Sequence, residues 1–248
     1  MQPILLVTGG SRGIGRATAI AAARQGYQVV VNYHHNADAA AEVVQAIKAQ
    51  NGHAVAMGAD VSSESDVVAM FARIDQELGA IDVLINNAGV VGLRDSVINM
   101  DAARLTRMFA VNITGSFLCA REAIKRMSTD LGGKGGRIVN VSSVASKHGA
   151  PGEYVDYAAS KGAIDTMTLG LAKEVATQGI RVNAVRPGLV YTDIHAASGE
   201  PGRADRIRPQ IPMQRVGNPE EVAAAILWLA STESSYSTGA VLDVAGGR

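Results

Sequence analysis

The segment "YVDYAASKG", residues 154–162, contains two tyrosines and one lysine whose spacing could support acid–base chemistry. Tyr157 and Lys161 are four residues apart, so on a helix they share a face, whereas Tyr154 and Lys161 align less well. An ammonium group beside a phenol favours the phenolate and lowers a pKa that starts near ~10. Such a pair can exchange protons near neutral pH. The same spacing also fits ordinary surface neighbours, so the interpretation depends on the rest of the chain.

A glycine-rich turn follows the first apolar run of the chain. It reads "TGGSRGIG", residues 8–15, and leads into the helical segment "RATAIAAA". Its glycines would let the backbone turn tightly and approach a pyrophosphate, while the helix N-terminus offers N–H groups to the phosphates. The spacing G-x-x-x-G-x-G differs from G-x-G-x-x-G and from a P-loop. The turn predicts a dinucleotide site that includes Gly9, Ser11, Arg12, Gly13, Ile14 and Gly15.

The end of the second apolar run, "VVVNYHHN", bears on which nicotinamide cofactor is bound. Asn32, which we also assign to the cofactor site, stands where NAD sites usually carry an acid for the adenosine ribose. Arg12 could instead pair with a 2′-phosphate, and His34 or His35 could assist. This pattern favours NADP(H). The alternative is that Arg12 is a solvated loop residue and that NAD(H) is also accepted.

These residues must be positioned by elements that alternate along the whole chain. Amphipathic segments such as "ADAAAEVVQAIKAQNG" separate short runs that are apolar throughout, as in strands buried on both faces of a parallel sheet. The order predicts an α/β, single-domain Rossmann fold over residues 1–248, with a doubly wound, mostly parallel seven-stranded sheet and helices on both faces. The predicted strands span residues 4–8, 28–32, 53–58, 82–86, 137–142, 180–185 and 240–244.

Composition excludes several classes of function. The 248 residues carry a formal net charge of zero, which gives no reason to expect nucleic acid or an anionic membrane as a partner. The single cysteine, Cys119, excludes an internal disulfide and fits a buried thiol, and the five histidines show no metal-ligand spacing. The N-terminus shows no signal-peptide pattern, and no run of ~20 apolar residues is present. We expect a soluble, cytoplasmic protein without a metal.

Residues 188–217 lack a clear period and contain three of the seven prolines. The segment follows a strand's C-terminal end, where open α/β sheets bind ligands, so we predict a substrate-binding lid. An ordinary surface loop is the alternative.

Several motifs together resemble one family. "TGGSRGIG", "NNAG" (86–89), "AVNITG" around Asn112, "VSSVAS" (141–146), "YAASK" (157–161) and "RPG" (186–188) occur in the order and approximate spacing of short-chain dehydrogenases/reductases. The resemblance extends to the closing "GAVLDVAGG", and lies near the bacterial 3-oxoacyl-acyl-carrier-protein reductases and glucose 1-dehydrogenases.

The resemblance implies four catalytic residues. Tyr157 would exchange a proton with the substrate oxygen, and Lys161 would lower the tyrosine pKa and hold the nicotinamide ribose. Ser143 would hydrogen-bond the reacting oxygen, and Asn112 would anchor a water on a proton path. Ser143 precedes Tyr157 by fourteen residues, where many relatives have thirteen, so Ser142 is a neighbouring candidate and the intervening loop carries an insertion.

The resemblance also implies further contacts with the dinucleotide. Asp60, followed by Val61, would bond the adenine amino group, although Asp60 could also be a helix N-cap. The "NNAG" motif would line the adenosine side and also support the strand end. The carboxamide would lie against the segment "RPGLVYT". The residues assigned to these contacts are Asn86, Ala88, Gly89, Pro187, Gly188, Val190 and Thr192.

We therefore expect an NAD(P)(H)-dependent oxidoreductase that interconverts a carbonyl and a secondary alcohol, with an NADPH-dependent reductase favoured. The alternatives are a sugar or polyol dehydrogenase and a non-catalytic dinucleotide sensor, although sensors typically lose the tyrosine or lysine retained here. The substrate class stays open. The predicted lid carries arginines at positions 203, 206 and 208 that could attract an acidic acyl carrier, but Asp205 and Glu200 offset part of that positive charge. The resemblance implies a homotetramer, built partly on the helix that continues from Lys161. Core packing of that helix alone is the alternative.

Overall fold

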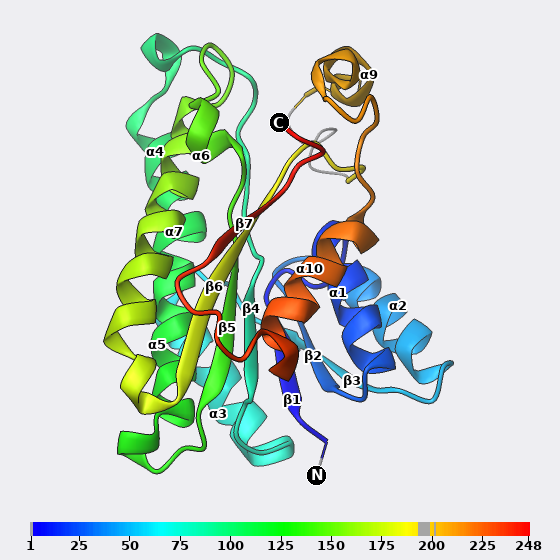
Figure 1. Cartoon of the computed structure of the whole chain (residues 1–248), viewed down its shortest axis with the longest axis vertical. Helices are drawn as coiled ribbons and strands as arrows, with labels where there is room; N and C mark the ends of the chain where they lie inside the picture. The colour runs from blue at the N-terminus through cyan, green and yellow to red at the C-terminus, as the bar shows by residue number, and fades with distance from the viewer. Residues whose placement is uncertain (1, 193–198, 201) are drawn as a thin grey trace.

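A single parallel sheet organises the chain (Figure 1). The computed structural model describes residues 2–192, 199–200 and 202–248. The sheet has seven strands in the order β3-β2-β1-β4-β5-β6-β7, and every neighbouring pair is parallel. The predicted fold class is confirmed, and each predicted strand has its counterpart. The strands are β1 (Ile4–Val7), β2 (Gln28–Tyr33), β3 (His53–Gly58), β4 (Val83–Asn86), β5 (Gly136–Val141), β6 (Ile180–Pro187) and β7 (Val241–Val244).

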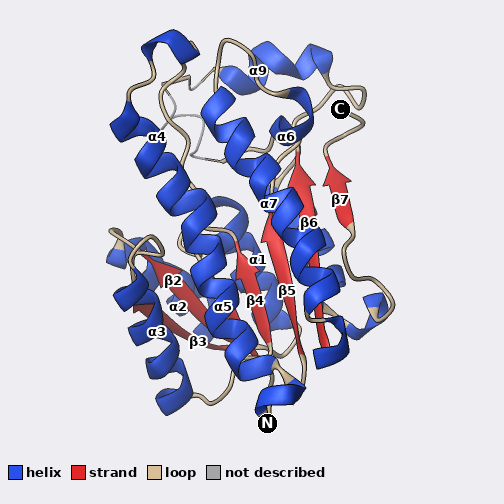
Figure 2. Cartoon of the chain, turned by 90° about the vertical axis from the view of Figure 1, so that its left-hand side faces the viewer, coloured by secondary structure: helices blue, strands red, loops and turns tan. Residues whose placement is uncertain are grey.

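Helices cover both faces of the sheet, as Figures 1 and 2 show. One face carries α1 (Gly13–Arg24), α2 (Ala37–Lys48) and α10 (Pro219–Ala230), which pack with the strands in one apolar core. The other carries α3 (Glu64–Glu77), α5 (Gly115–Met127) and α7 (Val155–Glu174), which pack in a second core. The shorter helices are α4 (Ala102–Phe109), α6 (Ala145–His148) and α9 (Arg203–Ile207).

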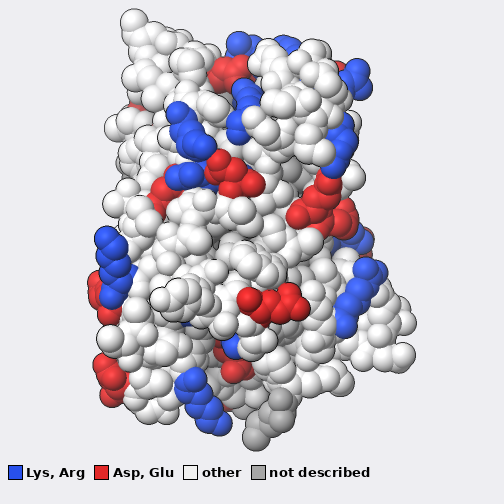
Figure 3. Space-filling model, viewed as in Figure 1, with Lys and Arg blue, Asp and Glu red and all other residues white. Residues whose placement is uncertain are grey.

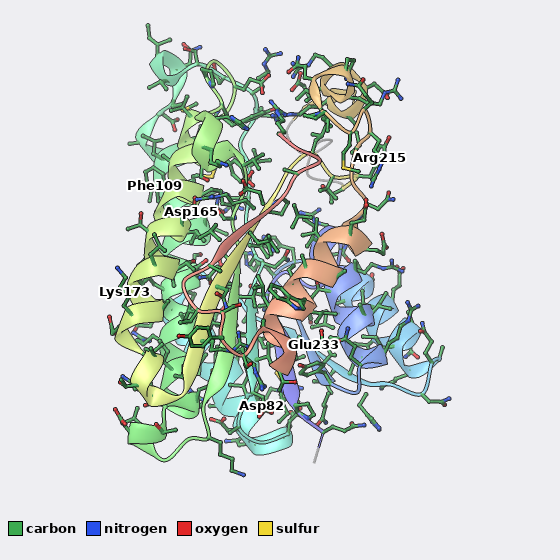
Figure 4. All side chains as sticks on the ribbon, in the orientation of Figure 1. Asp82, Phe109, Asp165, Lys173, Arg215 and Glu233 are labelled. Atoms are coloured by element: carbon green, nitrogen blue, oxygen red, sulfur yellow. The ribbon has the colours of Figure 1, made fainter. Side chains whose placement is uncertain are left out.

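The central strands are buried along their whole length, which explains their unbroken apolar sequences. All four residues of β1 and of β4 are buried. At the amino ends of these strands, Asp82 accepts a hydrogen bond from the Ile4 backbone N–H at 2.7 Å (Figure 4). Cys119 is fully buried in the core beneath α5, and burial raises the pKa of its thiol to about 12. It is a structural thiol, as expected.

A short π-helical turn, Ala110–Thr114, joins α4 to α5. Such wide turns add one residue to a helix and are frequent at functional sites. This one contains Asn112, whose side chain is completely buried. The turn therefore places a polar side chain inside the protein from the middle of a helical segment.

The predicted lid is described in part. Residues 193–198 and 201 lie outside the described residues, whereas α9 and the 3₁₀ turn Arg208–Gln210 are described. A small apolar cluster anchors this segment, formed by Leu189, Ala204, Ile207, Ile211 and Val216. Within the described part of the chain, no helix combines the length and the apolar character that crossing a membrane requires.

Candidate active site

A cavity of about 720 Å³ lies at the carboxyl ends of the strands. The loops after β1 and β4, between which the strand order reverses, both line it. Open α/β sheets bind their ligands at such a reversal point. The cavity wall contains three of the four predicted catalytic residues, Ser143, Tyr157 and Lys161. Residues far apart in sequence are thus brought to one site.

Lys161 and Tyr157 lie one turn apart on α7. The Lys161 ammonium donates a hydrogen bond to the Val141 carbonyl oxygen at 2.8 Å and lies 5.6 Å from the centroid of the Tyr157 ring. Burial lowers the pKa of Lys161 to about 8, and the negative charge of Asp165, further along α7 (Figure 4), opposes that change. The ammonium is thus directed at the end of β5.

Burial raises the pKa of the Tyr157 phenol, while the Ser143 hydroxyl and the positive charge of Arg203 lower it. The lowering that we expected from Lys161 is not seen in this arrangement, because its ammonium is turned toward a backbone carbonyl. The charged group that acts on the phenol is instead Arg203, at the start of α9.

Ser142 and Ser143 have different surroundings. The Ser142 hydroxyl donates to the Lys161 carbonyl oxygen at 3.1 Å and is buried, so it ties α7 to the end of β5. The Ser143 oxygen accepts from the Ala145 backbone N–H at 3.1 Å, and its hydroxyl acts on Tyr157. This geometry supports Ser143 rather than Ser142 as the group that meets the reacting oxygen.

The backbone of Tyr157 is held on both sides. Its N–H donates to Asp156 Oδ1 at 2.9 Å, and its carbonyl oxygen accepts from the Ser160 hydroxyl at 2.7 Å. Ser160 in turn accepts from Asn112 Nδ2 at 3.0 Å. The π-helical turn is thereby connected to the backbone of Tyr157 through the side chain of Ser160.

Asn112 also holds the loop that follows β4. Its Oδ1 accepts from the Val90 N–H at 2.8 Å, and its Nδ2 donates to the Val90 carbonyl at 2.9 Å. A Cβ atom at Gly89 would lie 3.4 Å from Asn112 Oδ1 and 3.6 Å from Lys161 Nζ, so these two side chains meet at Gly89. The amide of Asn112 positions other residues, and its expected part in holding a water stays a prediction.

Asn32 lines the cavity, but its amide is already used. Oδ1 accepts from the Gly9 N–H at 3.1 Å, and Nδ2 donates to the carbonyl oxygens of Tyr33, Met57 and Ala59. The side chain therefore braces the glycine-rich turn against β2 and β3 and has no spare donor for a ribose. Its neighbours His34 and His35 also line the cavity.

Some residues of the glycine-rich turn line the cavity, and others pack inside the turn. Gly9, Ser11, Arg12, Gly13 and Ile14 line the cavity, whereas Gly15 does not. A Cβ atom at Gly15 would collide with the Gly9 carbonyl oxygen and lie 2.6 Å from Asn87 Nδ2. Asn87 also holds this turn, because its Nδ2 donates to the carbonyl oxygens of Thr8 and Gly9. The sequence analysis did not assign this residue a role, although it belongs to "NNAG".

Asp60, which lines the cavity after β3, accepts hydrogen bonds from the Ser62 N–H at 2.9 Å and from the Ser62 hydroxyl at 2.7 Å. The N-cap of α3 is Ser63, so the interpretation of Asp60 as that cap is wrong. The Asp60 carboxylate lies 3.4 Å from His34 Nε2. The other predicted residues that line the cavity are Val61, Ala88, Gly89, Pro187, Gly188, Val190 and Thr192.

Asn86 does not line the cavity. Its Nδ2 donates to the Ser116 carbonyl at 3.1 Å and to Asn140 Oδ1 at 3.0 Å. The predicted contact of Asn86 with the cofactor is therefore corrected to a structural role between β4 and β5. Tyr154 is buried, lines the cavity, and holds its hydroxyl 3.3 Å from Glu200 Oε2.

The described residues contain no cluster of three or more histidine, cysteine, aspartate or glutamate side chains that could hold a metal ion. The cavity fits a dinucleotide instead. One part of its wall is formed by backbone N–H groups at the start of α1, where the first turn contains no acidic residue. Another part is formed by Tyr157, Ser143 and Lys161.

Comparisons with known proteins agree with this geometry. A family model described as enoyl-(acyl carrier protein) reductase matches residues 9–248. An uncharacterised oxidoreductase of Escherichia coli strain K12, YgfF, is 59% identical over 245 residues, covering 99% of each chain. Glucose 1-dehydrogenase 2 of Bacillus subtilis strain 168 is 40% identical over 98% of this chain and 93% of its own.

A 3-oxoacyl-acyl-carrier-protein reductase of Synechocystis is 41% identical over 98% of this chain and 96% of its own. Among solved structures, a short-chain type dehydrogenase/reductase from Mycobacterium marinum superposes with a TM-score of 0.92 at 36% identity. That match covers 99% of this chain and 94% of the other.

Proposed function

Because the chain belongs to the short-chain dehydrogenase/reductase family, whose members are NAD(P)-dependent oxidoreductases, we propose that it is an NADP(H)-dependent reductase of a small carbonyl compound. The observation that carries the proposal is one cavity in which Tyr157, Ser143 and Lys161 face a glycine-rich turn at the reversal point of the sheet. The family's relatives named above include both reductases and a sugar dehydrogenase, so the direction rests on the site itself.

The proton chemistry of the site supports reduction. When bound, the dinucleotide supplies the hydride. Ser143 would hold the carbonyl oxygen by a hydrogen bond, and Tyr157 would donate its phenolic proton to that oxygen as it becomes a hydroxyl. Since burial raises the pKa of Tyr157, the phenol stays protonated at neutral pH and is ready to act as the acid. Lys161, with a pKa of about 8, would bind ribose hydroxyls and return a proton to the phenolate.

The preference for NADP(H) rests on Arg12. This exposed side chain lines the cavity from the N-cap of α1 and forms no ion pair with any described residue. No carboxylate of β2 competes with it, because Asn32 occupies the position of the usual acid. A guanidinium group left without a partner beside the adenosine end suits a 2′-phosphate.

Binding of NADPH and NADH to the purified protein, measured side by side by calorimetry, tests the proposal. We expect NADPH to bind more tightly, and Arg12→Ala to weaken NADPH by about 10-fold or more while changing NADH by less than about 3-fold. Arg16→Ala is the matched control, because Arg16 is an exposed arginine of α1 that does not line the cavity. Equal losses for both cofactors would remove the phosphate-pairing argument.

We also propose that the protein is a homotetramer that uses the outer surfaces of α5 and α7. Two large apolar side chains on these helices are exposed in the single chain, Phe117 at 47% and Leu169 at 46%. Covering such side chains between subunits would remove apolar area from water. Native mass spectrometry should give a tetramer, and Phe117→Glu should shift it toward smaller species. A wild-type monomer would contradict the proposal.

A further inference from the structure

Arg203 extends from the lid into the catalytic end of the cavity. It begins α9, its side chain is only 16% exposed, and it lines the same cavity as Tyr157 and Ser143. The guanidinium carbon lies 4.6 Å from the centroid of the Tyr154 ring, which supports its planar face. Tyr154 is itself buried, so the arginine rests on a rigid surface three residues before the catalytic tyrosine.

The guanidinium of Arg203 has more donors than acceptors around it. Among the described residues, its one acceptor is Glu153 Oε2, which is 3.0 Å from Nη2. Nε is buried and has no hydrogen-bond partner within the described ranges of the chain. A buried N–H group without a partner is costly, and an arginine offers five donors in a planar fork suited to a carboxylate. The Nε–H group of Arg203 therefore lacks a hydrogen-bond acceptor.

The surrounding charges are also unbalanced. Glu153 is shared by Arg203, Arg206 at 2.9 Å and Arg94 at 3.7 Å, while Glu200 is shared by Arg206 at 2.9 Å and Arg94 at 3.3 Å. Within this cluster of described residues, three guanidinium groups face two carboxylates, and Glu200 does not line the cavity. Figure 3 shows basic side chains at this end of the molecule. One additional monoanion would balance the cluster.

We propose that Arg203 binds the carboxylate of the substrate, so that the physiological substrate is a small oxo acid and the product the corresponding hydroxy acid. A carboxylate matches the surplus of one positive charge better than a phosphate ester, which carries about −1.5 to −2 at neutral pH. Apolar side chains that include Val91, Val144 and Ile207 line the cavity and would contact the carbon chain. This proposal rests on the proposed function, and names its substrate class.

The reaction balances without any further reactant. The hydride of NADPH forms the new C–H bond at the carbonyl carbon, the C=O π bond opens, and the Tyr157 proton goes to the oxygen. NADP⁺ and a hydroxy acid result, and one proton is taken from solvent to restore Tyr157. The carboxylate is unchanged, and its contact with Arg203 would orient the carbonyl between Ser143 and Tyr157.

The test compares acids with neutral esters of the same carbon skeleton. NADPH oxidation is followed with 2-oxobutanoate, 3-oxobutanoate and 4-oxopentanoate and with their methyl esters, for wild type, Arg203→Gln and Arg203→Lys. We expect kcat/KM of wild type for at least one acid to exceed that of its ester by about 10- to 100-fold. Arg203→Gln should remove this preference, because its kcat/KM for the acid should fall far more than its kcat/KM for the ester. Arg203→Lys should keep part of the preference. The matched control is Arg208→Gln, since Arg208 is 53% exposed on the same segment, does not line the cavity, and should keep the preference.

Calorimetric binding of the same acids to the enzyme–NADP⁺ complex separates the two proposals. Turnover of esters with no preference for acids in wild type, or an acid preference that survives in Arg203→Gln, would overturn the assignment of Arg203 while leaving the carbonyl reductase intact. If no compound turns over, but acid binding still depends on Arg203, the assignment stands and the proposed reaction fails. If the acids do not bind at all, the assignment is wrong.

Discussion

Arg104 and Asp156 form a bidentate ion pair between α4 and the first turn of α7. Arg104 Nε donates to Asp156 Oδ2 at 2.7 Å and Nη2 to Oδ1 at 3.3 Å, and the aspartate side chain is completely buried. The same Oδ1 accepts the N–H of Tyr157. Gly92 packs against the guanidinium, where a Cβ atom would lie 2.8 Å from Cζ. The pair thus connects α4, the loop after β4 and the backbone of Tyr157.

Breaking this pair on one side should destabilise the protein strongly. Arg104→Met leaves a carboxylate buried without its partner, which typically costs about 3–5 kcal/mol of unfolding free energy. The double variant Arg104→Met/Asp156→Leu should recover much of that loss, because no unpaired charge remains. Urea unfolding of the three proteins measures the difference. A single variant as stable as the wild type would show that the pair contributes nothing to the fold.

Tyr157→Phe should abolish most turnover and leave NADPH binding within about 3-fold of wild type. General acid catalysis contributes about 10²- to 10⁴-fold, so a loss in kcat of that size is expected once the phenolic proton is gone. Tyr154→Phe is the matched control, since it deletes only the hydroxyl contact with Glu200 and should cost far less. Steady-state kinetics on any carbonyl substrate decides between the two tyrosines. Similar losses for both variants would remove Tyr157 from the role of acid.

The pKa of Lys161 predicts a pH dependence of stability. The lysine loses its proton near pH 8 when folded but keeps it up to its ordinary pKa of 10.5 when unfolded. Between these values the unfolded chain binds more protons, so the free energy of unfolding contributed by this group rises with pH. From pH 7.5 to 9.5, wild type should gain on the order of 1–2 kcal/mol relative to Lys161→Met. Urea unfolding at both pH values measures this. An equal pH slope in the two proteins would mean that burial does not lower the lysine pKa.

Gly15→Ala should impair cofactor binding although Gly15 does not line the cavity. The added methyl group meets the Gly9 carbonyl and Asn87 Nδ2, both of which help shape the glycine-rich turn. Displacing them should weaken NADPH by at least about 10-fold and destabilise the fold by about 1–3 kcal/mol, as overpacking usually does. Fluorescence titration with NADPH and thermal unfolding report the two effects. Unchanged binding would show that the turn can shift without affecting the phosphate site.

The central strands were predictable because burial on both faces leaves an unbroken apolar run, which can be recognised without knowing the neighbouring strands. The glycine-rich turn and the Tyr157–Lys161 pair were predictable because their chemistry is local in sequence. The partners of polar side chains were not predictable in the same way. Asn32 looked available for a ribose, yet its amide is used by residues as distant as Ala59.

Ion pairs between residues far apart in the sequence were also not predictable. Arg104 and Asp156 are separated by 52 positions, and Arg203 and Glu153 by 50. No periodicity relates such residues, because the pairing depends on how α4 packs against α7 and on where α9 lies relative to the turn before α7. The lid cations were visible in the sequence, but the unpartnered Nε of Arg203 could be found only in the folded chain.

The π-helical turn has a consequence for how this segment tolerates insertions and deletions. The extra residue shifts the angular phase of α4 relative to α5, so that Arg104 faces α7 while α5 keeps its own apolar side on the sheet. Deleting one residue within 110–114 would restore an even helical repeat and rotate α4 by about 100° about its axis. Asn112 and Arg104 could not then both keep their partners. The segment is therefore fixed in length.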